Sequence, residues 1–554
     1  MKAFLFIILA FSLMYNCVSE TIPVYLALRQ YNIPILKDRL KMISDPESDH
    51  FGKYYSRKEI TDLISPPVED MTRIMNWLGE NKITNIKNNG DMIKFYAEEI
   101  KIDNIFNTHL SILPRSTEYV IPESLRDVID FVELDTKIRN ATFKQVRRSL
   151  PTKCDDRFLG RESLIQLYNV TDDGVDHTVS GVLAEFQNNA GFSNDDLYTS
   201  QLANNQQKNG VSHIQGVNVG IDLESVLDVQ LMSSAGNNMD IWYWNTPYWL
   251  YSFSSDYFNS ENIANIVSMS WGWAQDSQCD IISCVNITSR DYVNRVNNEF
   301  LKISLRGTTI LAASGDAGAP GRTNEGCDES RPINPVFPGS SPYVTSVGAT
   351  YVPFENKTVN FTTPLCKQFG CITSKDEKSI NFDKASWTAG GGFDLYETTT
   401  PWWQNNSVQR YLNSGVILPK DGLYNKNGRA YPDISAIGHS CPVFVQGMMQ
   451  GVDGTSCSTP VVGGLLSYIH KHLWEKYELR LGFANPLLYY IQNTCETCFR
   501  DVVEGYNWCT EGGCCDDPTN YGFNATDGYD PVSGLGTINV GETISYIDNL
   551  LMRK

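Results

Sequence analysis

The chain has 554 residues, with 45 Lys and Arg against 64 Asp and Glu, which gives a net charge of −19. This length predicts two or more folding units, and a composition of 42% hydrophobic and 20% charged residues excludes a largely disordered chain. The acidic balance argues against nucleic acid as the main partner, because phosphate binding needs clustered Lys and Arg.

The first 19 residues predict a secretory signal peptide. Lys2 precedes an apolar run over 4–14, and the small residue Ser19 follows it, which is the order of an export signal. The alternative is a membrane anchor, but a span needs about 20 apolar residues. No later segment is long and apolar enough, so we expect an exported protein with no membrane span.

Cysteines and glycosylation sequons agree with export. Of the 14 cysteines, Cys17 lies in the signal peptide, so an odd number remains. In an oxidising compartment we expect disulfides with at least one cysteine left over, and metal binding by the 495/498 pair is the alternative. Short loops are candidates for closure by Cys279 with Cys284 and by Cys366 with Cys371, whereas the pairing of the C-terminal cysteines stays open. Asn-x-Ser/Thr sequons begin at Asn140, Asn169, Asn286, Asn356, Asn360, Asn405 and Asn524.

A change of composition near residue 150 predicts a domain boundary. Residues 20–150 contain no cysteine and are rich in Lys, Ile, Asp and Glu, whereas Gly, Trp and Cys become commoner from Cys154 onward. A basic stretch over 144–151, ending in Pro151, is typical of an exposed linker. It is either a simple interdomain loop or a processing region between a propeptide and a mature domain.

The second part alternates strand and helix patterns. Apolar runs over 263–270 and 308–313 predict buried strands that end in Ser/Gly loops, and the segments 220–232 and 459–474 predict helices. This alternation predicts a parallel α/β sheet with the active groups at the carboxyl ends of its strands.

Ser456 is a candidate nucleophile. It stands in the small-residue loop 454–460, directly before a Pro-initiated apolar helix. At a helix N-terminus the dipole and the free N–H groups favour a developing negative charge, as attack by a serine requires. The alternative is an ordinary helix cap.

Histidine does not offer an obvious base for this serine. None of the seven histidines lies in the His-Gly-Thr-His setting that subtilisin-type peptidases use. His470 and His472 lie farther down the helix that follows Ser456, and we expect them to face solvent.

Glu224 and Asp228 offer a carboxylate base instead. Their i, i+4 spacing places them on one helix face, and the surrounding helix sequence is apolar nearly all round. Burial beside a second carboxylate separates the two pKa values and lets the pair share a proton, which suits a general base backed by an acid. The alternative is ordinary surface charge.

Two further acidic segments carry weaker signals. Asp316 follows the strand 308–313 in a glycine-flanked turn, where a protonated carboxyl donates a hydrogen bond to an oxyanion or a turn Asp simply satisfies local backbone. Near the C-terminus, Asp501 and Asp530 with turn carbonyls of Thr526 and Gly528 form a hard oxygen set that suits Ca²⁺.

In this order, the segments resemble the sedolisin family of serine-carboxyl peptidases over nearly the whole chain. The Glu-x-x-x-Asp helix of that family matches Glu224 and Asp228, its Ser-Gly-Asp turn matches Asp316, and its Gly-Thr-Ser loop matches Ser456. The chain departs from the family pattern at Cys457, where Ala is usual. Further segments that resemble the family are 50–55, 267–272, 389–393, 431–434 and 523–536.

The resemblance implies an α/β fold, with a subtilisin-like parallel sheet flanked by helices and preceded by a smaller α+β propeptide domain. It implies a signal peptide over 1–19, a propeptide domain over 20–150 and a peptidase domain with a C-terminal calcium loop over 151–554. Asp453 stands where a small residue is common in the family, and we expect an extra acid there to shift the pH profile.

The resemblance also assigns roles to the candidate residues. Ser456 is expected to be the nucleophile, Glu224 the base, Asp228 its partner carboxylate and Asp316 the protonated oxyanion donor. One structural Ca²⁺ is expected on the side chains of Asp501 and Asp530 and the carbonyls of Val502, Thr526 and Gly528.

The implied activity is that of an acid-active peptidase made as a self-processing zymogen. Peptides or proteins are the expected substrates, and the propeptide is the expected intramolecular inhibitor. Similarity is closest to the branch that releases tripeptides from free N-termini. A carboxylate base and a protonated Asp316 both work in acid, so we expect an acidic optimum in a lysosome or after secretion. The alternatives are an acid endopeptidase of the same family, a His-based serine peptidase, and an inactive calcium-stabilised secreted glycoprotein.

Overall fold

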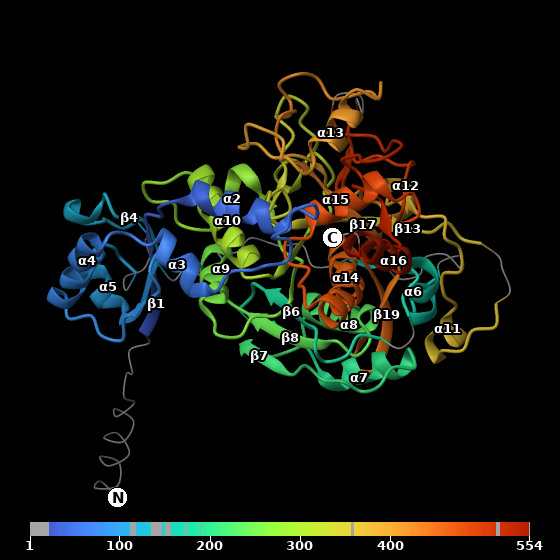
Figure 1. Cartoon of the computed structure of the whole chain (residues 1–554), viewed down its shortest axis with the longest axis horizontal. Coiled ribbons are helices and arrows are strands. Elements are labelled where there is room, and N and C mark those ends of the chain that lie inside the picture. The colour runs from blue at the N-terminus through green and yellow to red at the C-terminus, as the bar shows by residue number, and fades with distance from the viewer. Residues whose placement is uncertain are drawn as a thin grey trace, which may run out of the picture. The chain divides into compact units, whose positions relative to one another are not determined.

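The computed structural model describes residues 21–110, 118–134, 157–171, 174–188, 190–355, 359–516 and 521–552, and the backbone of 147–149. The chain divides by contacts into two compact units (Figure 1): residues up to 31 with 64–136, and residues 32–63 with the chain from 137 onward. The predicted signal peptide and Cys154 lie outside the described residues, and the boundaries proposed for processing stay predictions.

The first unit is an antiparallel sheet accompanied by helices. Its strand order is β2-β3-β1-β4, and the central strand β1 is buried from its second residue to its last, as its almost continuous apolar sequence predicts. The smaller α+β part of the predicted fold is therefore confirmed. Its elements are β1 (Thr21–Leu28), α4 (Val68–Glu80), β2 (Lys87–Asn88), β3 (Met92–Glu98), α5 (Glu99–Phe106), η1 (Glu123–Leu125) and β4 (Ile129–Glu133).

Residues 32–63 belong to the second unit. They form α2 (Ile33–Ser44) and most of α3 (Arg57–Ile64), and α2 packs against α10 (Ser289–Leu305). Between the two helices, the Tyr54 hydroxyl donates a hydrogen bond of 2.9 Å to the carbonyl of Leu481. Gly482 has φ +57°, and a Cβ there would lie 2.0 Å from the Tyr54 hydroxyl, so the close approach of this ring requires glycine.

The second unit is built on an eight-stranded sheet. Its order is β14-β13-β11-β9-β6-β8-β7 with β17 beside β13, and every pairing is parallel except that of β14. This confirms the predicted parallel α/β sheet. Its strands are β6 (Ser180–Glu185), β7 (His213–Gly216), β8 (Asp240–Asn245), β9 (Ile266–Met269), β11 (Thr309–Ala313), β13 (Thr345–Tyr351), β14 (Lys378–Ser379) and β17 (Ile434–Ile437).

Two buried helices, α8 (Leu223–Ala235) and α14 (Thr455–Tyr477), lie side by side and pack on this sheet (Figure 1). Their backbones approach closely, since a Cβ on Gly464 would lie 2.4 Å from the amide nitrogen of Gly236. The helix predicted over 459–474 is confirmed and begins four residues earlier. The other helices of this unit are α6 (Arg161–Tyr168), α7 (Asn194–Ala203), α9 (Leu250–Asn259), η2 (Gln275–Asp280), η3 (Arg322–Asn324), α11 (Pro364–Phe369), α12 (Phe382–Ala385), α13 (Asn405–Leu412), α15 (Asn485–Thr494) and α16 (Val540–Leu551).

Short strands complete the unit, and one of them lies in the predicted linker. The backbone of β5 (Arg147–Ser149) pairs antiparallel with Gly451, Val452 and Asp453 of β19 (Met448–Asp453). The remaining strands are β10 (Trp273–Ala274), β12 (Val336–Phe337), β15 (Gly392–Phe393), β16 (Ala430–Tyr431), β18 (Cys441–Val445), β20 (Phe499–Arg500), β21 (Cys509–Thr510), β22 (Gly513–Cys514) and β23 (Thr537–Ile538).

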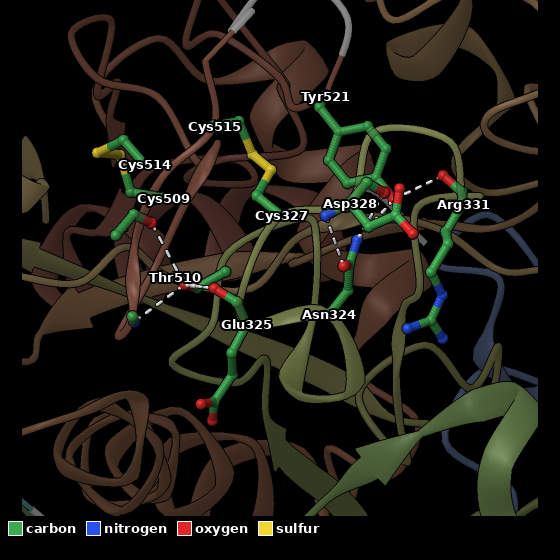
Figure 2. The surroundings of a disulfide bond; sticks show 12 residues. Asn324, Glu325, Cys327, Asp328, Arg331, Cys509, Thr510, Cys514, Cys515 and Tyr521 are labelled. Carbon is green, nitrogen blue, oxygen red and sulfur yellow. Dashed lines mark hydrogen bonds between the residues drawn. A yellow bond between two sulfur atoms is a disulfide. The ribbon is translucent and has the colours of Figure 1, made fainter.

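Disulfides close short loops and join distant segments. The expected pairs 279–284 and 366–371 are confirmed, and the C-terminal cysteines pair as 495–498 and 509–514. A fifth bond joins Cys327 to Cys515, across 188 residues of sequence (Figure 2). Among the described cysteines, Cys441 and Cys457 are free and buried. No helix in the described part of the chain is long and apolar enough to cross a membrane.

Candidate active site

A pocket of about 880 Å³ opens where several strands of the large sheet end. Strands β9 and β11 lead into it, and the first turns of α8 and α14 form its wall. The carboxyl edge of a parallel sheet is the expected place for such a site. The pocket is lined by Gln187, Asp222, Leu223, Glu224, Ser270, Trp271, Gly272, Ala313, Gly315, Asp316, Arg322, Val336, Trp387, Asp453, Thr455, Ser456 and Glu511.

Ser456 occupies the first turn of α14 and is 7% exposed. Its hydroxyl lies close enough to Glu224 to lower the pKa of that carboxyl in part, and it lies 3.4 Å from the carbonyl oxygen of Ser270. Pro460 has no N–H, so the Ser456 carbonyl receives no helical hydrogen bond, and Ser270 Oγ lies 3.5 Å from it instead. The sequence predicted this position at a helix N-terminus, and the structure places the hydroxyl against a carboxyl group.

Glu224 and Asp228 lie on the same side of α8, as their spacing predicts. Burial, followed by the charge of Glu185, raises the pKa of Glu224 well above its ordinary value, and the nearby Ser456 hydroxyl lowers it in part. Asp228 is fully buried behind the pocket and accepts a hydrogen bond of 2.8 Å from Ser270 Oγ. Burial, then the charges of Glu185 and Glu224, also raises the pKa of Asp228 strongly. The pair is therefore suited to hold and pass a proton.

Glu185 is a third carboxyl group that acts on Glu224 and Asp228, and it was not among the residues predicted from the sequence. It is the last residue of β6, is fully buried, and accepts a hydrogen bond of 2.8 Å from Trp271 Nε1. Burial, then the charge of Asp222, raises the pKa of Glu185 to about 8. One sequence signal could have indicated it: Glu185 ends the mostly apolar segment 180–185, and an acidic residue at the end of a buried strand is typical of an active site.

Asp316 faces the nucleophile from another side of the pocket. It follows β11, and its Oδ1 accepts hydrogen bonds from the backbone N–H of Thr455 at 2.8 Å and from Thr455 Oγ1 at 2.7 Å. Arg322 Nη2 lies 3.9 Å from Oδ2. The carboxyl group of Asp316 is thus held by the residue that directly precedes the nucleophile.

The wall that carries Arg322 and Glu511 is tied together covalently. The disulfide between Cys327 and Cys515 joins the segment after η3 to the hairpin of β21 and β22 (Figure 2). Thr510 Oγ1 donates a hydrogen bond of 2.7 Å to the carbonyl of Glu325, which adds a second link between the same segments.

The described histidines contact other groups than Ser456. His439 Nδ1 lies 2.9 Å from Asp453 Oδ2 and lines a different, smaller cavity. His472 Nε2 lies 2.6 Å from Asp548 Oδ1. The expectation that His470 faces solvent is wrong, because this residue is 2% exposed within α14 and burial lowers its pKa to about 4. Of the candidate bases, Glu224 is the one whose pKa the Ser456 hydroxyl affects.

The predicted calcium ligands come together around one turn. Gly528 N–H donates to Asp501 Oδ2 at 2.5 Å, and Thr526 N–H donates to Asp530 Oδ2 at 2.9 Å. Burial raises the pKa of Asp530 to about 7 and raises that of Asp501. The side chain of Asp530 is buried on this turn, and that of the exposed Asp501 reaches the turn from another segment. Two carboxyl groups at one turn fit a divalent cation, which would stabilise their ionised forms. Groups of three or more acidic, His or Cys side chains around a metal position are absent from the described residues.

Known proteins resemble this chain over most of its length. Residues 18–136 match the family described as Pro-kumamolisin, activation domain, and residues 179–480 match the Subtilase family. Physarolisin from Physarum polycephalum is 34% identical over 548 residues, which cover 96% of this chain and 94% of that protein. Tripeptidyl-peptidase 1 from Homo sapiens is 29% identical over 557 residues, which cover 94% and 90%.

A solved structure shares the fold. Pseudomonas sedolisin, a serine-carboxyl proteinase complexed with two molecules of pseudo-iodotyrostatin, superposes with a TM-score of 0.51 at 20% identity. The match covers 71% of this chain and 98% of that one.

Proposed function

The chain belongs to the sedolisin family of serine-carboxyl peptidases, with a Pro-kumamolisin-type activation domain ahead of its subtilase domain, and from that premise we propose that it is an acid-active tripeptidyl-peptidase made as a self-processing zymogen. Peptides with a free N-terminus are the proposed substrates. The observation that carries the proposal is that Ser456, Glu224 and Asp316 line one pocket, with the Ser456 hydroxyl near enough to Glu224 to lower its pKa in part.

In the proposed mechanism, Glu224 accepts the Ser456 proton as the hydroxyl oxygen attacks the scissile carbonyl. Asp228, the neighbouring carboxyl group, shares the proton with Glu224 and so stabilises the protonated pair. Protonated Asp316 and the backbone N–H groups at the start of α14 hold the oxyanion. Glu224 then returns the proton to the leaving amine, and water releases the acyl group by the same steps in reverse.

Acidic pH is part of the proposal. A carboxyl group donates a hydrogen bond to an oxyanion only while it carries a proton, which an acidic medium supplies. A carboxyl group can also serve as the base in acid, where an ordinary imidazole is already charged. We therefore expect activity to fall as the pH rises toward neutrality.

Self-processing is supported by the position of β5. This strand lies in the predicted linker, and its backbone pairs with the last residues of β19, which lead directly to the nucleophile loop. We propose that the chain is cut between about Arg148 and Asp156, which separates a propeptide that acts as an inhibitor. The relatives named above and the match to an activation domain support this step.

One structural Ca²⁺ is also proposed. The carboxylates of Asp501 and Asp530 and the carbonyls of Val502, Thr526 and Gly528 would hold it. The ion would neutralise the charges of the buried Asp530 and the exposed Asp501 and fix the turn over 526–530. It takes no part in the bond-breaking steps.

The test is cleavage of an unblocked tripeptidyl fluorogenic peptide from pH 3 to 8 by acid-activated protein. We expect an acidic optimum, a loss of about 10⁴-fold or more in Ser456→Ala, and a loss of about 10²- to 10⁴-fold in Glu224→Gln. An N-terminally blocked peptide separates the tripeptidyl-peptidase from an acid endopeptidase, because only the latter cuts it. Full activity of Glu224→Gln would mean that a histidine is the base. Inactivity of the processed protein at every pH would contradict the proposal.

A further inference from the structure

Asp222 is a carboxylate of the pocket that the proposed mechanism does not use. It lines the pocket with Glu224 and Ser456, and it is only partly buried. It stands two residues before Glu224, so a peptide whose scissile carbonyl reaches Ser456 and Glu224 passes close to it. Its position therefore gives it access to the groups that flank the scissile bond.

The simplest role for Asp222 is to cap α8. Its Oδ2 accepts hydrogen bonds from Ser225 N–H at 3.2 Å and from Ser225 Oγ at 3.4 Å. A neutral Asn or Ser caps a helix as well as Asp does, so capping does not require the negative charge. The charge needs a separate explanation.

That charge is unfavourable in the peptidase by itself. Asp222 contributes to raising the pKa of Glu185, Glu224, Asp228 and Tyr243, which are the titratable groups facing it from β6, α8 and β8. In the part of the chain that the structure describes, no Lys, Arg or His forms an ion pair with it, and the cation lining the pocket, Arg322, lies beside Asp316. A cation from outside the chain would compensate this charge.

We propose that Asp222 is a specificity residue that binds a cationic group of the peptide substrate, an ammonium or a guanidinium, beside the scissile bond. A partly desolvated carboxylate favours a charged partner over an uncharged one of the same shape. Two parts of a peptide carry this chemistry: the free N-terminal ammonium and the side chain of Lys or Arg. This inference rests on the proposed peptidase function.

The experiment measures binding in a Ser456→Ala background, where peptides are not cut. Fluorescent peptides are compared in two matched pairs at pH 6: free against acetylated N-terminus, and Lys against norleucine next to the scissile bond. We expect the cationic member of one pair to bind about tenfold or more tightly, and that pair identifies the source of the cation. Adding Asp222→Asn, which keeps a capping oxygen, should bring the ratio to within about twofold of unity.

The matched control is Asp195→Asn in the same background. Asp195 is an exposed carboxylate in the first turn of α7, outside the pocket, so the change in net charge is the same. This variant should keep the full preference for the cationic peptide. An equal loss in both variants would mean a general charge effect and would overturn the inference.

A second measurement needs no variant of Asp222. Burial raises the pKa of this carboxyl above its ordinary value, so its negative charge is lost as the pH falls toward 4. The preference for the cationic peptide should therefore weaken steadily from pH 6 to pH 4. A preference that is absent at pH 6 in both pairs, or unchanged by Asp222→Asn, would overturn the inference, whereas absence of turnover by the parent protein would contradict the proposed function alone.

Discussion

Three carboxyl groups form a row beside the Ser456 hydroxyl: those of Glu185, Glu224 and Asp228. Burial and the charges of neighbouring carboxylates raise the pKa of each group, which favours its protonated form. Three such groups cannot all ionise in a site with little water, because each added charge acts on the others at low dielectric. The row therefore titrates as a unit. Which of its members is ionised at a given pH decides whether Glu224 acts as a base.

At the scale of one residue, we predict that Glu185→Gln shifts the alkaline limb of the pH–rate profile to lower pH and leaves the acid limb in place. Gln keeps an acceptor for Trp271 Nε1 and resembles the protonated Glu185 of acidic solution, but it removes the charge that Glu185 gains as the pH rises through about 8. That charge raises the pKa of Glu224, so without it the remaining protons leave at lower pH. The measurement is kcat/KM from pH 3 to 9. The exposed Glu496→Gln is the control and should leave both limbs in place; an unmoved alkaline limb in Glu185→Gln would show that the two groups are not coupled.

Helices α8 and α14 act as one element, because they carry the base and the nucleophile and touch at their backbones. Gly463 and Gly464 leave α14 without side chains where Met232 and Ala235 of α8 approach it. Small residues at such a crossing let two helices approach more closely than ordinary side chains allow. The distance between Glu224 and Ser456 thus depends on residues two or more turns away.

At the scale of these elements, we predict that Gly464→Ala destabilises the protein by about 1–3 kcal/mol and reduces kcat. The added Cβ would lie 2.5 Å from the Cβ of Ala235, so the helices must separate. Denaturant unfolding and steady-state kinetics measure the two effects. Gly79→Ala in α4 is the control, since nothing lies within 4 Å of its added Cβ, and this variant should be no less stable than the parent.

The link between Cys327 and Cys515 leads to another prediction at this scale. Replacing both cysteines with Ser should loosen the wall that carries Arg322 and Glu511, and thus raise KM more than it lowers kcat. The same double change at Cys279 and Cys284, which lie outside the pocket lining, should leave KM unchanged. Equal effects of the two double variants on KM would contradict a role for the wall.

At the scale of the whole molecule, stability is predicted to decrease from pH 4 to pH 8 in the absence of Ca²⁺. The pKa of Glu185 is raised to about 8 and that of Asp530 to about 7, so the folded state binds protons that the unfolded chain releases above about pH 4. Their stabilising contribution is present below about pH 4 and is lost as the pH rises through 7 and 8.

His470 opposes this trend over part of the range. Its pKa is lowered to about 4, so the folded state is disfavoured as the pH falls from about 6.5 toward 4. The two carboxyl shifts together are larger than this single shift, so they decide the sign. Thermal unfolding in EGTA at pH 5 and pH 8 should give the higher Tm at pH 5, and Glu185→Gln should reduce the difference. Equal Tm values at the two pH values would contradict this account.

Calcium removal tests the proposed metal site at the same scale. EGTA should lower Tm at pH 6, since a ligand at about 100 times its Kd stabilises a folded protein by about 2.7 kcal/mol. Asp530→Asn should abolish this response to EGTA, because it removes the buried one of the two carboxylates. Asp527→Asn changes an exposed residue of the same turn and should keep the response. A response that survives Asp530→Asn would place the ion elsewhere.

The sequence by itself determined the parallel α/β sheet, the helices that carry Glu224 and Ser456, and the acidic residues at two of the strand and turn ends. These features depend on local periodicity and on short motifs, which can be recognised in the sequence without knowledge of the fold. The local disulfides at 279–284 and 366–371 were predictable for the same reason, since ring closure over five residues needs no knowledge of the fold.

Only the tertiary structure decided which distant groups share one environment. Glu185 acts on Glu224 through its charge from a strand far away in sequence, and Cys327 meets Cys515 across 188 residues. The burial of His470 likewise depends on what packs against α14 and not on its own helix. Burial and through-space charge set these properties, and both follow from how the sheet and helices are assembled.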